Sequence, residues 1–310
     1  MTDLHNVADE TALSLDSMLG PARGRYFGDG YKEVRHALTG AIRFDGPDAE
    51  ATACVSYPPQ WSLDAAGMAK EPHLSSIDAV VLPLLILDRL GTPPSAWVAQ
   101  MHLRAGSTPW TDLDQVPVLL SADEREDLTA LQTFRARTGN VCTFMKISSV
   151  EPITFRNGAR GQTNVYEALY RSTQSKTDII GYDEGAGTLH ARHHFATDAV
   201  CPENTRSGFE ASYWPGLTVV DHFATMGQMA QAIIELRHGV GRAGNLWMRR
   251  VSITLDDAPM PLPGRMESSM TITRDRFIER SGRRYRDIAV ESSSSAGVRV
   301  IALLAHEDVT

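Results

Sequence analysis

The chain has 310 residues, of which 42% are hydrophobic and 22% are charged, and this composition excludes a disordered protein. Its 30 Lys and Arg against 38 Asp and Glu give a net charge of −8, which argues against a general binder of nucleic acid or anionic membranes. The longest apolar run, residues 79–87, is too short for a bilayer span, which takes about 20 residues. We therefore expect a globular protein with one large domain or two ordinary ones.

The N-terminal residues and the cysteines indicate the compartment. Residues 1–18 contain no basic region followed by an apolar stretch, so we expect no signal peptide. The three cysteines, Cys54, Cys142 and Cys201, are an odd number without CxxC spacing, which is typical of free thiols. The sequence therefore predicts a cytoplasmic protein.

The first half of the chain contains one apolar helix with strand-like segments on both sides. Alternation of apolar and polar residues, interrupted by turn residues, predicts the strands. They lie at residues 36–44, 51–57, 96–105, 116–121 and 140–149. A mostly apolar helix is predicted between the second and third of these strands, with Ser75 as its N-cap and its end near Leu90.

The second half has the same organisation. Its predicted strands lie at residues 163–173, 187–195, 247–255, 267–275, 285–293 and 297–305. Short turn segments separate the last four strands, which we expect to form a meander. A second apolar helix is predicted between the second and third strands, with Thr218 as its N-cap and its end near Gly239.

The starts of the two helices share one pattern, which indicates an internal repeat. Ser75 and Thr218 each stand three residues before an aspartate, Asp78 or Asp221, as in an N-cap with an acid at position N3. The acid also suits the positive end of the helix dipole. The two aspartates are 143 positions apart, which is close to half of the chain.

The repeat and the strand pattern together predict the fold. A helix that is apolar nearly all round must be buried, and an antiparallel sheet wrapped around it buries most of its surface. We therefore predict an α+β double hotdog, in which each of two antiparallel sheets wraps around one central apolar helix. Its halves are residues 1–157 and 158–310. A single hotdog needs a partner at its edge strand, which the two halves supply to each other, and a further homodimer stays open.

The start of the second helix is the first candidate for chemistry. Asp221, Thr225 and Gln228 are spaced to lie on one face, and His222 lies about 100° away. Asp221 is either only the capping acid or a general base beside a helix N-terminus, whose free N–H groups would hold a thioester carbonyl.

His73 is the second candidate. It precedes the first helix and, with an ordinary pKa near 6.5, could exchange a proton at neutral pH. The alternative is a histidine that packs or caps at the helix start. Asp78 is expected to act as a capping acid, because no polar group follows it on the same face of the helix.

A loop and an aromatic pair complete the candidates. Arg104 could pair with a phosphate or carboxylate, and Ser107 and Thr108 could bind an oxyanion or hydroxyl groups. An ordinary loop after a strand is the alternative. Tyr213 and Trp214 could line a groove or pack in the core.

Four segments carry a family resemblance. Residues 25–38 (RYFGDGYKEVRHAL), 56–62 (SYPPQWS), 72–79 (PHLSSIDA) and 103–113 (LRAGSTPWTDL) resemble the avirulence D family of plant-pathogenic pseudomonads and actinobacterial relatives. The resemblance implies synthesis of syringolides, which are acyl glycosides built from a β-ketoacyl chain and xylulose. It also implies a functional similarity to the A-factor (γ-butyrolactone) synthases, which are tandem hotdogs. No residue role is carried over from the family.

The residues and the resemblance lead to one hypothesis. A β-ketoacyl thioester, carried by acyl carrier protein or CoA, would react with a hydroxyl of a ketose such as xylulose or its phosphate. The ester would then cyclise to a butenolide, with no metal or redox cofactor. The expected catalytic residues are Asp221, His73 and His222. The expected substrate-binding residues are Arg104, Ser107, Thr108, Gln228, Thr225, Trp214 and Tyr213.

Two other functions stay open. The first is a hotdog thioesterase or dehydratase, and the second is a non-catalytic protein that binds an acyl ligand. The net charge of −8 would not attract an acidic carrier protein or a sugar phosphate, so a local basic cluster must bind such a partner. We expect that cluster at Arg104 or at Arg249 and Arg250.

Overall fold

The computed structural model of the chain describes most of its residues. The described ranges are residues 13–64, 66–123, 131–151, 153, 163–239, 246–280 and 282–307. The predicted boundary between residues 157 and 158 lies outside them.

Both long helices begin as the sequence predicts. α3 spans Ser76–Arg89 and α4 spans Val219–His238. In each, the N-cap side chain accepts from the N3 backbone N–H, and the N3 aspartate accepts from the N-cap N–H. α4 ends at Gly239, whose φ of 60° is the left-handed conformation that glycine adopts readily at a helix C-terminus.

One antiparallel sheet of 13 strands forms most of the fold. Its strands from the first half are β2 Arg35–Asp45, β3 Asp48–Ser56, β4 Trp97–Arg104, β5 Val116–Ala122, β6 Leu131–Thr138 and β7 Val141–Ser148. The others are β1 Leu13–Ser14, β9 Thr173–Asp183, β10 Thr188–Thr197, β12 Leu246–Leu255, β13 Gly264–Arg280, β14 Arg283–Ser294 and β15 Val298–Glu307. β8 (Thr163–Asn164) and β11 (Arg206–Ser207) form a separate parallel pair.

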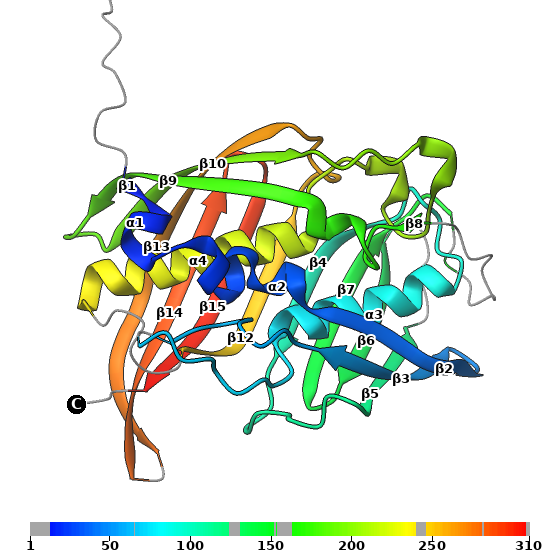
Figure 1. Ribbon diagram of the computed structural model, residues 1–310, viewed down its shortest axis with the longest axis horizontal. Coiled ribbons are helices and arrows are strands. Elements are labelled where there is room, and N and C mark those ends of the chain that lie inside the picture. The colour runs from blue at the N-terminus through cyan, green and yellow to red at the C-terminus, as the bar shows by residue number, and fades with distance from the viewer. Residues whose placement is uncertain are drawn as a thin grey trace, which may run out of the picture.

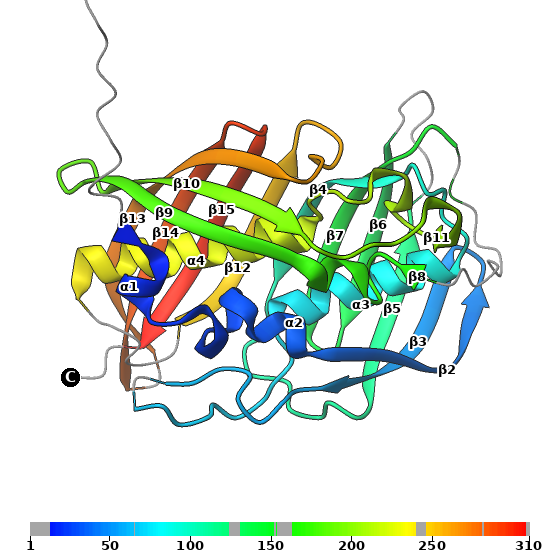
Figure 2. The same cartoon turned by 45° about the horizontal axis from the view of Figure 1, so that its top comes forward.

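The strand order places β2 to β7 together at one end of the sheet. It runs β1-β9-β10-β13-β14-β15-β12-β4-β7-β6-β5-β3-β2, so the pairing of β4 with β12 joins them to the other strands, with Arg250 opposite Arg104. α3 contacts β2, β3 and β5 to β7, while α4 contacts β10 and β13, and the two helices touch each other. Figures 1 and 2 show both helices on one side of the curved sheet, with β9 and β10 crossing in front of α4. The expected antiparallel strands packed on two buried helices are therefore present, in one continuous sheet, and their division into two hotdogs stays a prediction.

Alternation along the strands supplies the core around each helix. In β3, Ala49, Ala51, Ala53 and Val55 are buried, and the residues between them are more exposed. All of α3 from Ile77 to Asp88 is buried, as a helix apolar on every side requires. The same burial takes Asp78 and Asp221 out of water, so their hydrogen-bond partners decide what they can do.

Three expectations about strands are wrong. Residues 163–173 form the two-residue β8, a turn and the 3₁₀ helix η3 (Leu169–Ser172) in place of one long strand. β6 and β9 are strands that the sequence pattern did not predict. β12 is not next to β13 in the expected meander, because it pairs with β15 and β4.

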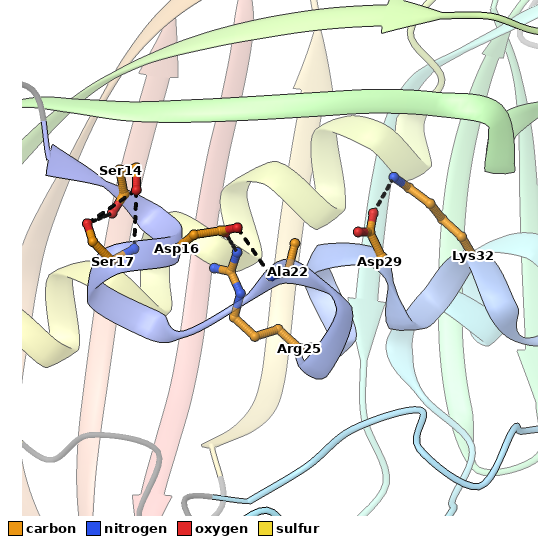
Figure 3. A network of polar contacts seen from close by, with 7 residues as sticks. All are labelled: Ser14, Asp16, Ser17, Ala22, Arg25, Asp29 and Lys32. Atoms are coloured by element: carbon orange, nitrogen blue, oxygen red, sulfur yellow. Dashed lines mark hydrogen bonds and ion pairs between the residues drawn. The ribbon is translucent and has the colours of Figure 1, made fainter.

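A segment before β2 covers the open side of α4. It contains α1 (Leu15–Leu19), η1 (Ala22–Gly24), the π-helix η2 (Tyr26–Gly30) and α2 (Tyr31–Glu33). Both α1 and η2 contact α4, and β1 pairs with β9. Figure 3 shows two ion pairs in this segment, Arg25 with Asp16 and Lys32 with Asp29. We name residues 13–34 the cover segment.

The other short helices lie in the second half. η4 spans Glu203–Thr205 and η5 spans Ala211–Tyr213. Within the described ranges, no helix is both long and apolar enough to cross a membrane.

Candidate active site at the helix starts

Asp221 is a buried carboxylate with one free oxygen. Its Oδ2 accepts hydrogen bonds from the Thr218 N–H and hydroxyl, both at 2.8 Å. Its Oδ1 has no hydrogen-bond partner among the described residues. Burial raises the pKa of Asp221 to about 6, although the Thr218 bonds and the charge of Lys32 lower it. Asp221 is therefore able to gain and lose a proton near neutral pH.

Thr173 is close to Asp221 without a standard hydrogen bond to it. Its hydroxyl lowers the pKa of Asp221, yet neither Thr173 Oγ1 nor Asp221 Oδ1 has a partner of normal geometry within the described ranges. Both are buried polar atoms, which proteins rarely leave unpaired.

Asp78 holds the equivalent position on α3, but its oxygens are fully used. His36 Nε2 donates to Oδ1 at 2.7 Å, and Oδ2 accepts from the Ser75 N–H at 2.7 Å and from the Tyr57 hydroxyl. The Tyr26 hydroxyl extends this cluster by a hydrogen bond to the Ser75 hydroxyl. Asp78 therefore stabilises the helix start, as expected, and also binds β2 through His36.

Two stacked, buried tyrosines join α2 to η3. The rings of Tyr31 and Tyr170 are 6.4 Å apart and inclined by 19°. Burial is the main cause that raises the pKa of Tyr170 to about 12, and the charges of Asp78 and Asp221 contribute less. Its hydroxyl is buried without a partner among the described residues. Tyr170 is therefore a neutral donor available to a ligand in this layer.

His222 faces a different environment from Asp221. Burial lowers the pKa of His222 to about 4, so the imidazole is neutral at pH 7. Burial is also the main cause that lowers the pKa of His193, on β10, to about 3. His193 is also bonded to the hydroxyls of Thr177 (2.8 Å) and Ser268 (2.6 Å). Its neighbour His194 is exposed, so the two side chains point to opposite faces of β10.

The face of α4 that carries Asp221 continues to a cavity under the cover segment. Thr225 and Gln228 are both buried. Gln228 lines a cavity of about 300 Å³ together with Arg25, Asp29 and Thr177. Asp221, Thr225 and Gln228 therefore lie on one face of α4. This face runs from the buried carboxylate of Asp221 to the cavity that Gln228 lines.

His73 lies in an aromatic cluster. Its ring is 5.8 Å from the rings of Trp61 and Trp247, and its Nδ1 is 3.2 Å from the Glu71 carbonyl oxygen. Within the described ranges, no hydrogen bond or ring contact joins it to Asp221. Trp247 lies in β12, so His73 contacts the strand that pairs with β4.

The remaining predicted residues do not gather at the helix starts. Arg104, Ser107 and Thr108 are exposed at the end of β4 and in the loop after it, where the Thr108 carbonyl accepts from Asn140. Tyr213 donates to the Ser95 carbonyl at 2.9 Å, and Trp214 is buried in the core. Packing thus accounts for Trp214.

The sequence reasoning missed the partners of Asp78, which are His36 and Tyr57. It also missed the stacked pair of Tyr31 and Tyr170. Two signals were available. The segment 25–38 carries part of the family resemblance, and alternation along residues 36–44 places His36 on the same face as the buried Leu38.

The fold and the buried acid together define a class of protein. An antiparallel sheet wraps two helices, and a buried acid with a free oxygen stands at the start of one of them. The chain belongs to the family described as Pseudomonas avirulence D protein (AvrD), whose family model matches residues 11–308. The resemblance read from the sequence is therefore confirmed over nearly the whole chain.

Comparison with solved structures finds distant similarities at low identity. A tesB protein of Mycobacterium avium subs paratuberculosis is similar with a TM-score of 0.49 and 10% identity, over 86% of this chain and 96% of that one. A hot dog fold protein of unknown function from Alicyclobacillus acidocaldarius gives 0.42 and 10%, over 92% and 98%. The acyl-CoA thioesterase II TesB2 of Mycobacterium marinum gives 0.43 and 9%, over 86% and 94%. No curated protein matches the chain.

Proposed function

We propose that the chain is an acyltransferase that joins a β-ketoacyl thioester to a hydroxyl of a ketose. The proposal includes a double hotdog fold with halves 1–157 and 158–310. The observation that carries it is the free Oδ1 of Asp221, a buried carboxylate whose pKa is raised to about 6, at the start of a buried helix. A general base needs both an unoccupied oxygen and a pKa near the working pH.

Asp221 acts as the general base in the proposed reaction. Its carboxylate takes the proton of the ketose hydroxyl, and the oxygen attacks the thioester carbonyl carbon. The N–H groups of the first helical turn stabilise the resulting oxyanion, since such groups have no acceptor within the helix. The carbon–sulfur bond then breaks, and the leaving thiolate takes the proton back from Asp221. The products are an ester and a free thiol.

The remaining predicted residues have supporting roles in this proposal. Thr225 and Gln228 bind the substrate along α4, and His73 and His222 remain candidate proton carriers. Arg104, Ser107, Thr108, Tyr213 and Trp214 remain candidates for binding substrate outside the helix starts. The ester cyclises when its acidic α-carbon attacks the ketose carbonyl, and loss of water gives a butenolide. Holding both groups in one molecule makes this step effectively unimolecular.

Thiol release measured with and without sugar tests the proposal. The full chain is incubated with a β-ketoacyl-CoA, with a β-ketoacyl carrier protein, and with each in the presence of xylulose or its phosphate. We expect thiol release that depends on the ketose, and a product whose mass contains both acyl chain and sugar. Equal release without a ketose would favour a thioesterase. Water loss from a 3-hydroxyacyl thioester would favour a dehydratase, and tight binding with no release would favour an acyl-binding protein.

A further inference from the structure

A second cavity, of about 480 Å³, opens beside the cover segment. One wall consists of the cover segment and the first residue of β2, and the other wall is η3. Its charged lining residues are Arg23, Lys32, Arg35, Arg171, Asp29 and Glu33. We name it the η3 cavity. It lies outside the features used in the proposed acid–base chemistry.

The lining of the η3 cavity has an excess of positive charge. Four cations face two carboxylates, in a chain whose net charge is −8. Among these lining residues, Lys32 forms an ion pair of 2.8 Å with the carboxylate of Asp29 (Figure 3). In the part of the chain that the structure describes, Arg23 and Arg35 form no ion pair. A local excess of positive charge attracts anions even though the net charge of the protein is negative.

Arg171 is held in place at the η3 cavity but retains a free donor. Its Nη1 donates to the Glu167 carbonyl at 2.7 Å, and its guanidinium lies 5.1 Å from the centre of the Tyr170 ring. Its Nε is buried with no acceptor among the described residues. A guanidinium fixed by two contacts loses little entropy on binding, and its fork matches the oxygens of a phosphate.

The η3 cavity lies next to the proposed reaction centre. Asp29, which forms the 2.8 Å ion pair with Lys32, lines both the η3 cavity and the cavity that Gln228 lines. Gln228 shares the face of α4 that carries Asp221, and the charge of Lys32 lowers the pKa of Asp221. A ligand anchored in the η3 cavity would therefore have its other end near Asp221.

We propose that the η3 cavity binds the phosphate group of a substrate. This inference rests on the proposed function, because it names what positions one of the two reactants. The phosphate belongs either to a phosphorylated ketose or to the phosphopantetheine or CoA that carries the acyl chain. It is a different place from the expected phosphate site at Arg104, which is exposed at the end of β4 and stays a prediction.

Binding measured by calorimetry tests the inference without turnover. Inorganic phosphate is titrated into the full chain and into the variants Arg35→Gln and Arg171→Gln. The matched control is Arg43→Gln, because Arg43 is also exposed on β2 but does not line the η3 cavity. We expect each of the first two variants to weaken binding about tenfold or more, since a charge-assisted bond is lost, and the control to bind as the parent does. Arg35 is exposed, so its variant is expected to fold even if the Arg171 variant does not.

Two further titrations show whether the bound phosphate belongs to the ketose or to the carrier of the acyl chain. Tighter binding of xylulose phosphate than of xylulose, lost in Arg35→Gln, places it on the ketose. Tighter binding of CoA than of pantetheine, lost in the same variant, places it on the carrier. Absence of both differences, or equal phosphate binding by all variants, overturns the inference. Thiol release with an unphosphorylated ketose reports separately on the proposed function, so each proposal can fail alone.

Discussion

Asp78 and Asp221 hold the same N3 position on two helices, but only Asp78 has both carboxylate oxygens hydrogen-bonded to other described residues. His36 and Tyr57 supply the extra bonds at Asp78. At Asp221 the N-cap threonine supplies two bonds to one oxygen and leaves the other open. One copy of the repeat therefore has a structural acid, and the other has an acid that we propose to be reactive.

The pH dependence of turnover follows from the raised pKa of Asp221. The base works as a carboxylate, so kcat/KM should rise with pH through about 6, the pKa that burial gives this group. The rate of thiol release is measured across this range with a saturating ketose. Asp221→Asn should remove the inflection. A flat profile in the parent protein would contradict the assignment of Asp221 as the base.

Replacing His36 should unfold the first half of the chain more easily. His36→Ala removes the 2.7 Å contact and leaves Asp78 buried beside an unfilled space. Leaving a buried hydrogen-bond acceptor without its partner costs about 1–3 kcal/mol of unfolding free energy. Chemical denaturation measures the loss, with His194→Ala as the exposed control. A loss below about 1 kcal/mol would mean that Tyr57 and Ser75 suffice for Asp78.

Glu210 should make the protein less stable as the pH rises. It is buried, it accepts from the Tyr166 hydroxyl at 2.6 Å and from the Val98 N–H at 3.1 Å, and burial raises its pKa from 4.5 to about 7. The folded state therefore favours the protonated form. That stabilisation is complete below about pH 4.5 and is lost as the pH rises through about 7.

The variant Glu210→Gln isolates this contribution. Its melting temperature should fall less than that of the parent protein as the pH rises from about 4.5 to about 7. Some slope remains, because burial also raises the pKa of Asp88. Glu50→Gln, at an exposed position of β3, is the control and should keep the parent slope. Identical slopes in all three proteins would refute the prediction.

Gly227 tests the packing of the cover segment on α4. A Cβ at this position would lie 2.9 Å from the Phe27 ring, so Gly227→Ala must displace that ring. Overpacking costs about 1–3 kcal/mol, which exceeds the gain of about 1 kcal/mol that alanine brings to a helix. We expect a lower melting temperature and faster proteolysis within the cover segment. Gly181→Ala, with no atom within 4 Å of its added Cβ, is the control. A stabilised Gly227→Ala protein would show that the segment packs loosely.

The sequence predicted what local chemistry determines. Both capping boxes are formed by residues three positions apart, so Ser75 with Asp78 and Thr218 with Asp221 could be recognised without the fold. β10 was also predicted, because buried and exposed residues alternate along it.

Other features depend on contacts that the sequence does not encode locally. β6 places Gln132 and Thr138 inward, and β9 places Thr173 and Thr177 inward, so the apolar alternation is too weak to recognise. Residues 163–173 have β-forming side chains, but contacts such as Tyr170 with Tyr31 fix them in turns and η3. The pair of His36 and Asp78 joins residues 42 positions apart, so only the fold reveals it.

Parallel measurements on Asp221→Asn and Asp78→Asn test the central claim most directly. We expect Asp221→Asn to keep the parent melting temperature within a few degrees and to lose about 10²-fold or more of ketose-dependent thiol release. We expect Asp78→Asn to melt at a clearly lower temperature, because its bond with His36 is weakened. Normal thiol release by a folded Asp221→Asn protein would contradict the account and return Asp221 to the role of a capping acid.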